Sequence, residues 1–146
     1  KNIENKYGKT LLFSGDSIRN IFNLKTYSKS ERSKISKKFS KFAKAITNQN
    51  INLILATVSM IRSFRKWNRK NMDNYVEIYI RSDVKKIIKR RKKKIYLKKN
   101  KQNIVGIDIK PELPEKPDII INNDFKKSIK FLSKETLFKI NKHIKS

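Results

Sequence analysis

The stretch LLFSGDSIRN, Leu11–Asn20, predicts a strand that runs through a short turn into a helix. Its apolar run, Leu11 to Phe13, is continuous rather than alternating, which is typical of a strand covered on both faces and favours a parallel sheet. Asp16 and Arg19 follow the Ser-Gly turn, three residues apart. Because ligands bind at the carboxyl ends of parallel strands, this carboxylate and this guanidinium are candidate functional groups.

Strand and helix patterns alternate along the rest of the chain. The apolar runs INLILATVS at 51–59, YVEIYI at 75–80 and IIIN at 119–122 predict three further strands. The segments between them have helical or loop patterns. This alternation predicts an α/β layered domain built on a parallel sheet. Asp16, Arg19, Ser59 and Arg62 then follow strand ends and are expected along one edge of the sheet.

The helices have recognisable starts. Ser28, followed three residues later by Glu31, is a capping-box signature before a helix with an apolar stripe. Either Ser82 or Asp83 is placed to cap a helix through VKKIIKRR. The chain closes on FKKSIKFLSKETLFKINKHIKS, which predicts one or two amphipathic helices.

Composition excludes several classes of function. The chain has 146 residues and no cysteine, which excludes disulfides, the usual zinc fingers and a cysteine nucleophile. The one histidine, His143, lies in a Lys-rich tail and indicates a solvated helix face rather than a metal ligand. No apolar run reaches the roughly 18 to 20 residues that span a bilayer, so we expect a soluble cytoplasmic protein with no membrane partner.

The formal net charge of +26 makes nucleic acid a partner to consider. Lys, Asn and Ile crowd every segment, however, so the base composition of an AT-rich gene explains the charge equally well. A basic nucleic-acid-binding module without catalysis remains an alternative, supported by patches such as KRRKKK. Proteins that bind nucleic acid usually have aromatic side chains among their basic ones, whereas this patch has only Tyr96. The alternative therefore ranks below an enzyme.

Five motifs, in order, resemble those of the adenylylsulfate kinases, which move the γ-phosphoryl group of ATP to the ribose 3′-hydroxyl of adenosine 5′-phosphosulfate. SGDSIR resembles the family's D-G-D-N-I/V-R, YSKSER its F-S-x-x-D-R, VSMIRSFR its I-S-P-Y-R-x-x-R, and RRKKKIY its R-D-x-K-G-L-Y. VGIDIKPELPEKPD matches G-I/V-D-x-x-Y/F-E-x-P-x-x-P-E/D. The resemblance runs from about Thr10 to Asp124. It implies a three-layer P-loop NTPase-like α/β domain over 1–146, with a lid at 91–106.

The resemblance gives roles to residues of the first two motifs. Asp16 would orient or deprotonate the accepting hydroxyl, and Arg19 and Arg32 would bind anionic groups of the substrate, for which a planar guanidinium gives bidentate geometry. Tyr27 stands where a family phenylalanine stacks on the substrate base. Other readings stay open: Asp16 as a helix cap, Tyr27 as a hydrophobic staple, and the two arginines as solvated cations.

The later motifs imply further substrate contacts. Ser59 and Arg62 would lie against the substrate at a strand end. In the lid, Lys93 and Tyr96 would close over both nucleotides. Ile104 occupies the position of a second base-stacking aromatic.

The part that would hold ATP is not identifiable in this sequence. G-x-x-x-x-G-K-S/T does not occur, and the three glycines do not supply such a phosphate-binding loop. The family's loop follows a strand in the middle of the sheet, so we expect about 25 to 35 further residues, a strand, the loop and the start of a helix, to precede Lys1. The implied cofactors are ATP and Mg²⁺.

Departures from the family pattern bear on the acceptor. Ile35 replaces an asparagine, Lys37 and Lys38 replace two arginines, and Ile104 replaces an aromatic. The sequence therefore predicts an adenylylsulfate kinase-like enzyme acting on a nucleotide-linked anion, with adenylylsulfate or a cytidine diphosphoramidate of capsule modification as acceptor. A homodimer and a degenerate, non-catalytic kinase fold are left open.

Overall fold

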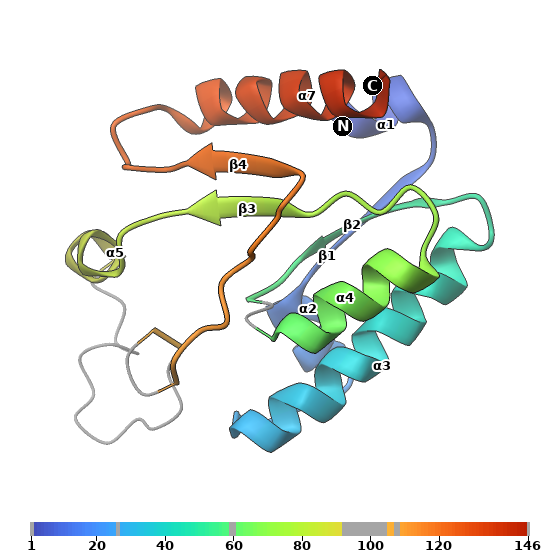
Figure 1. Ribbon diagram of the computed structural model, residues 1–146, viewed down its shortest axis with the longest axis vertical. Helices are drawn as coiled ribbons and strands as arrows, with labels where there is room; N and C mark the ends of the chain where they lie inside the picture. Colours follow the sequence, from blue (N-terminus) through green and yellow to red (C-terminus); the bar gives the residue numbers. More distant parts are fainter. Residues whose placement is uncertain (1, 26, 59–60, 92–104, 107–108, 146) are drawn as a thin grey trace. The chain divides into compact units, whose positions relative to one another are not determined.

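The computed structural model describes residues 2–25, 27–58, 61–91, 105–106 and 109–145 (Figure 1). Its elements, in chain order, are α1 (Asn2–Tyr7), β1 (Thr10–Ser14), α2 (Gly15–Ile21), α3 (Lys29–Thr47), β2 (Asn52–Ala56), α4 (Arg62–Asn71), β3 (Ile78–Arg81), α5 (Val84–Arg91), β4 (Ile119–Asn122) and α7 (Ile129–Lys145).

The chain forms two compact units. The first unit comprises Lys1–Tyr75 and Pro111–Leu113, and the second comprises Val76–Lys110 and Pro114–Ser146. The single domain expected over 1–146 stays a prediction.

The first unit is built on the parallel pair β1 and β2, in register from Thr10 opposite Asn52 to Ser14 opposite Ala56. Helix α3 packs on β2 and beside α4 (Figure 1). The ring of Phe42 on α3 meets that of Phe13 on β1 edge to face, with centroids 5.6 Å apart. The parallel pairing predicted from the apolar runs is confirmed.

Strand β1 departs from the prediction in one respect. Leu12 keeps 68% of its surface exposed and Leu11 keeps 40%, so this strand is not covered on both of its faces. Helix α3 packs through Phe42 against Phe13. Because neighbouring side chains of a strand point to opposite faces, Leu12 lies on the side away from that contact.

The second unit is built on the parallel pair β3 and β4, with α7 along β4 (Figure 1). Ile119 and Ile121 are buried, whereas Ile120 between them is exposed, which is the period-two pattern of a strand covered on one face. Strand β3 begins at Ile78 rather than at Tyr75 as predicted. The carbonyl oxygen of Glu77 accepts from the amide of Ile119 at 3.1 Å, but the amide of Glu77 donates to the Asp118 carboxylate at 2.7 Å instead of to a backbone carbonyl.

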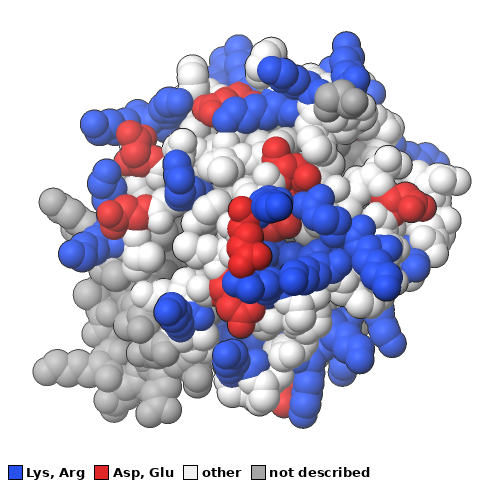
Figure 2. Space-filling model, in the orientation of Figure 1, with Lys and Arg blue, Asp and Glu red and all other residues white. Residues whose placement is uncertain are grey.

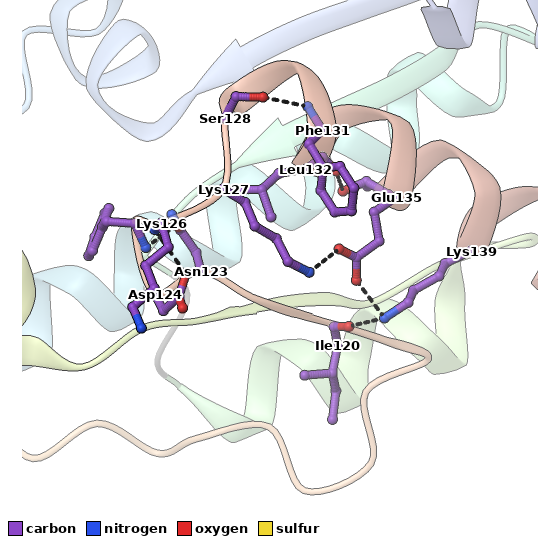
Figure 3. Close-up of polar contacts among 12 residues, drawn as sticks. Ile120, Asn123, Asp124, Lys126, Lys127, Ser128, Phe131, Leu132, Glu135 and Lys139 are labelled. Carbon is purple, nitrogen blue, oxygen red and sulfur yellow. Dashed lines mark hydrogen bonds and ion pairs between the residues drawn. The ribbon is translucent and has the colours of Figure 1, made fainter.

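Two open questions about the helices are answered in this unit. Asp83 caps α5, because its carboxylate accepts from the amides of Lys85 and Lys86, whereas the hydroxyl of Ser82 donates to the carbonyl oxygen of Asn123. A single helix, α7, closes the chain, and Ser128 accepts from the amide of Phe131 at its start (Figure 3). The predicted α/β class is confirmed in both units.

Candidate functional site

The junction of β1 and α2 places Asp16 at the carboxyl edge of the first unit's sheet. Ser14 is the cap of α2: its hydroxyl accepts from the amide of Ser17 at 3.0 Å, and the Ser17 hydroxyl accepts from the amide of Ser14 at 2.9 Å. The alternative that Asp16 caps this helix is therefore wrong. Asp16 lies in the first turn with an exposed side chain, and Arg19, three residues on, is its neighbour along the helix.

The end of α2 turns the chain back towards Arg19. Asn23 has a left-handed backbone, with φ of 51°, and the amide of Leu24 donates to the carbonyl oxygen of Arg19 at 2.8 Å. This is the Schellman arrangement that ends many helices, and asparagine tolerates the left-handed position better than most residues. Tyr27 follows within a few residues, just before Ser28 caps α3 by accepting from the amide of Glu31.

Arg19, Tyr27 and Arg32 meet in what we call the arginine–tyrosine cluster. The guanidinium carbon of Arg19 lies 4.4 Å from the centroid of the Tyr27 ring, and that of Arg32 lies 5.3 Å from it. Nε of Arg32 also donates to the carbonyl oxygen of Tyr27 at 2.9 Å, and a terminal nitrogen of Arg19 donates to that of Leu24 at 3.3 Å. Two guanidiniums from different helices are thus held on one aromatic ring.

The electrostatics of this cluster favour an anion. Partial burial, followed by the charge of Arg19, lowers the pKa of the Arg32 guanidinium, while Tyr27 raises it. A lowered pKa means that the charged form is disfavoured by desolvation and by its like-charged neighbour. A phosphate or sulfate bound here would offset the repulsion between the two guanidiniums and would offer the bidentate geometry that guanidinium groups prefer.

The carboxyl end of β2 lies beside Asp16. A Cβ built on Gly15 would lie 3.5 Å from the methyl carbon of Thr57, so the two strand ends are in contact distance. Arg62 begins α4 after β2, at the same edge of the parallel pair. Asp16, Arg19 and Arg62 are thus all on elements that leave one edge of the sheet.

Sequence reasoning missed Glu112 and Arg65. The Glu112 carboxylate accepts from the amide of Arg62 at 2.7 Å, and the Arg65 guanidinium donates to the carbonyl oxygens of Glu112 and Leu113 at 2.7 and 3.2 Å. The available signal was the presence of both residues in the matched motifs, since the second arginine of VSMIRSFR is Arg65 and the glutamate of PELP is Glu112.

A hollow of about 330 Å³ lies between the turn after α2 and helix α3. It is lined by three of the positions that depart from the family pattern, Ile35, Lys37 and Lys38. Leu24, whose carbonyl oxygen accepts from Arg19, lines it as well. Three of the departures therefore lie together near the cluster, and the fourth, Ile104, lies outside the described residues.

Four of the predicted substrate contacts, Ser59, Lys93, Tyr96 and Ile104, lie outside the described residues. Among the described residues, no group of three His, Asp or Glu side chains could hold a metal ion. None of the helices in that part of the chain has the length and apolar character needed to cross a bilayer. Figure 2 shows lysine and arginine side chains spread over the face in view, with acidic side chains in smaller groups among them.

The chain is similar to several known proteins. The family model described as adenylylsulphate kinase matches residues 1–122. The chain is 35% identical over 127 residues to the cytidine diphosphoramidate kinase of Campylobacter jejuni subsp. jejuni serotype O:2, covering 85% of this chain and 74% of the relative. It is 27% identical over 128 residues to a probable adenylyl-sulfate kinase of Archaeoglobus fulgidus, covering 85% and 83%.

One solved structure also resembles the chain closely in fold. The Mycobacterium tuberculosis APS kinase CysC, solved in complex with AMPPNP and APS, superposes with a TM-score of 0.80 at 19% identity. The match covers 99% of this chain and 87% of that one. The predicted P-loop NTPase-like α/β fold is confirmed by this likeness.

Proposed function

Because the chain belongs to the adenylylsulphate kinase family, we propose that it transfers the γ-phosphoryl group of ATP to a ribose 3′-hydroxyl of a nucleotide-linked anion. The observation that carries the proposal is the arginine–tyrosine cluster, whose Arg19 follows Asp16 by three residues on the helix that leaves the carboxyl edge of the sheet. Phosphoryl transfer depends mainly on positioning and charge stabilisation, and these residues can supply both.

Each residue has a distinct part in the proposal. The guanidiniums of Arg19 and Arg32 bind the anionic group of the acceptor, and the Tyr27 ring lies next to its base. The exposed carboxylate of Asp16 orients the accepting hydroxyl and takes its proton as the phosphoryl group arrives. Arg62 is the acceptor contact at the start of α4, and Ser59, Lys93, Tyr96 and Ile104 are retained as proposed contacts.

ATP and Mg²⁺ belong to the proposal as phosphoryl donor and its counter-ion. Mg²⁺ in kinases keeps several waters and is held by one or two carboxylates together with substrate phosphates. With its waters and the substrate phosphates as ligands, the ion would meet Asp16 only through its water shell, so the carboxylate would stay available as the base. The bound ion would neutralise charge on the transferring phosphoryl group.

Two observations favour a cytidine diphosphoramidate-type acceptor over adenylylsulfate. The relative named as a cytidine diphosphoramidate kinase shares 35% identity with this chain, against 27% for the probable adenylyl-sulfate kinase. In addition, Ile35, Lys37 and Lys38 replace the family's asparagine and two arginines along one hollow. Such an acceptor would place the enzyme in capsule or surface-polysaccharide modification.

The proposal also includes a cytoplasmic location and a homodimer. Light scattering of the purified protein would test the homodimer.

An acceptor panel tests the proposal. The full-length protein would be assayed for ADP release with ATP, Mg²⁺ and, separately, adenylylsulfate, cytidine diphosphoramidate and CDP. We expect acceptor-dependent turnover at physiological salt with at least one nucleotide-linked anion. Asp16→Asn should lower kcat by about 10² to 10⁴-fold while leaving acceptor binding intact. Turnover by Asp16→Asn at the wild-type rate would refute the role of this carboxylate, and salt-sensitive nucleic-acid binding without ADP release would favour the non-enzymatic alternative.

A further inference from the structure

The segment Pro111–Leu113, which we call the PEL segment, belongs to the first unit although its neighbours on both sides belong to the second. Glu112 and Arg65 hold it there. The Glu112 carboxylate accepts from the backbone amide of Arg62 at 2.7 Å, and the Arg65 guanidinium donates to the backbone of Glu112 and Leu113. Arg65 keeps only 6% of its surface exposed.

Helix α4 begins without a cap from its own sequence. Its N-cap residue, Ile61, makes no side-chain capping bond, and its first turn contains no acidic residue. The first amides of a helix need hydrogen-bond acceptors, and the helix dipole favours negative charge at that end. Glu112, 50 residues further along the chain, supplies both. The start of α4 therefore depends on the PEL segment.

We infer that Glu112 is a positioning residue for the acceptor site, because it fixes the first residue of α4 and so the direction in which the Arg62 side chain leaves the edge of the sheet. The inference rests on the proposed function, in which Arg62 contacts the acceptor. Arg65 has the complementary part: by binding the carbonyl oxygens of Glu112 and Leu113, it keeps the PEL segment, and hence the carboxylate, at the helix start.

The contributions of Glu112 and Arg62 can be tested by separate substitutions. The bond that Glu112 makes at the start of α4 is to the backbone amide of Arg62. Arg62→Ala therefore removes the proposed acceptor contact and leaves the Glu112 bond in place. Glu112→Ala removes the bond to the amide and leaves the Arg62 side chain present. Glu112→Gln keeps an accepting oxygen on a side chain of the same length, without the charge.

The experiment is a double-mutant cycle on the full-length protein, with the acceptor KM as readout. We expect Glu112→Ala to raise this KM about tenfold, the loss expected of one charge-assisted hydrogen bond, with a smaller change in kcat. Glu112→Gln should raise it less. In an Arg62→Ala background, Glu112→Ala should change the acceptor KM by less than about twofold, because the side chain that it positions is already gone.

Hydrogen exchange provides a readout independent of turnover. Amides in the first turn of α4 should exchange about tenfold faster in Glu112→Ala than in the wild-type protein, because their acceptor is lost. Asp73→Asn is the matched control: it removes one exposed carboxylate just beyond the other end of α4 and should leave both KM and exchange unchanged.

Two results would overturn the inference: the same KM increase with and without the Arg62 side chain, or wild-type exchange at the start of α4 in Glu112→Ala. If the wild-type protein turns over no acceptor, the proposed function fails instead, and the exchange rates alone decide whether Glu112 fixes the helix start.

Discussion

Replacing Arg32 with glutamine should harm acceptor binding far more than it harms the fold. In the folded protein this guanidinium makes a 2.9 Å bond to the carbonyl oxygen of Tyr27 and lies 5.3 Å from the centroid of its ring. A partly exposed hydrogen bond contributes about 0.5–1.5 kcal/mol, and an exposed cation–π contact contributes about 0.5–1 kcal/mol. Repulsion from Arg19, which helps to lower the pKa of Arg32, offsets part of this. We expect a net destabilisation of about 1 kcal/mol.

The loss in binding should be larger. A hydrogen bond from a charged donor to an anion contributes about 1.5–3 kcal/mol, which corresponds to about 10- to 150-fold in kcat/KM for the acceptor. Arg32→Lys keeps the charge but loses the planar fork, so its kcat/KM should fall between those of the wild-type protein and of Arg32→Gln. Steady-state kinetics with varied acceptor, together with urea denaturation of each variant, would measure the two effects separately.

The first unit offers a matched control. The guanidinium carbon of Arg69 lies 5.5 Å from the centroid of the Tyr75 ring, near the other end of α4. Arg69→Gln therefore removes the same charge and a similar ring contact away from the carboxyl edge, and it should leave kcat/KM within about twofold of wild type. If Arg32→Gln retains the wild-type kcat/KM, or if Arg69→Gln loses as much, the arginine–tyrosine cluster is not the anion site.

Three further perturbations test the rest of the structure. Ser14→Ala removes the cap of α2 and should lower the free energy of unfolding by about 0.5–2 kcal/mol in chemical denaturation; an unchanged midpoint would count against the capping box. Ile121→Ala, at a side chain with 1% exposure, should cost about 2–5 kcal/mol, and Ile120→Ala on the exposed face of the same strand clearly less; equal losses would contradict the orientation of β4. The carboxylate of Glu135 binds Lys139 at 3.1 Å and Lys127 at 3.3 Å (Figure 3), and the bond from Lys139, followed by that from Lys127, lowers its pKa. A lowered folded-state pKa gives stability that is present above the unfolded value, about 4.3, and is lost as the pH falls through the folded value. Between about pH 6 and pH 3, the Tm of the wild-type protein should therefore drop more than that of Glu135→Gln. Parallel curves of Tm against pH for the two proteins would refute the pairing.

The sequence by itself determined those features that short-range patterns control. Continuous apolar runs predicted the strands and their parallel pairing, and the spacing of Ser28 and Glu31 predicted the start of α3, which the structure confirms. The ordered motifs predicted the family. Such features depend on residues a few positions apart, so the periodicity of side chains along a strand or helix makes them predictable from the sequence.

Only the tertiary structure decided which distant groups meet. The chain turns at the left-handed Asn23, and the Tyr27 ring contacts guanidiniums from both α2 and α3. The carboxylate of Glu112 accepts from the amide of Arg62, 50 residues earlier in the chain. The amide of Glu77, just before β3, donates to the carboxylate of Asp118, 41 residues on. A side chain that satisfies a backbone group far along the chain depends on the path of the folded backbone, and no local period in the sequence records that path.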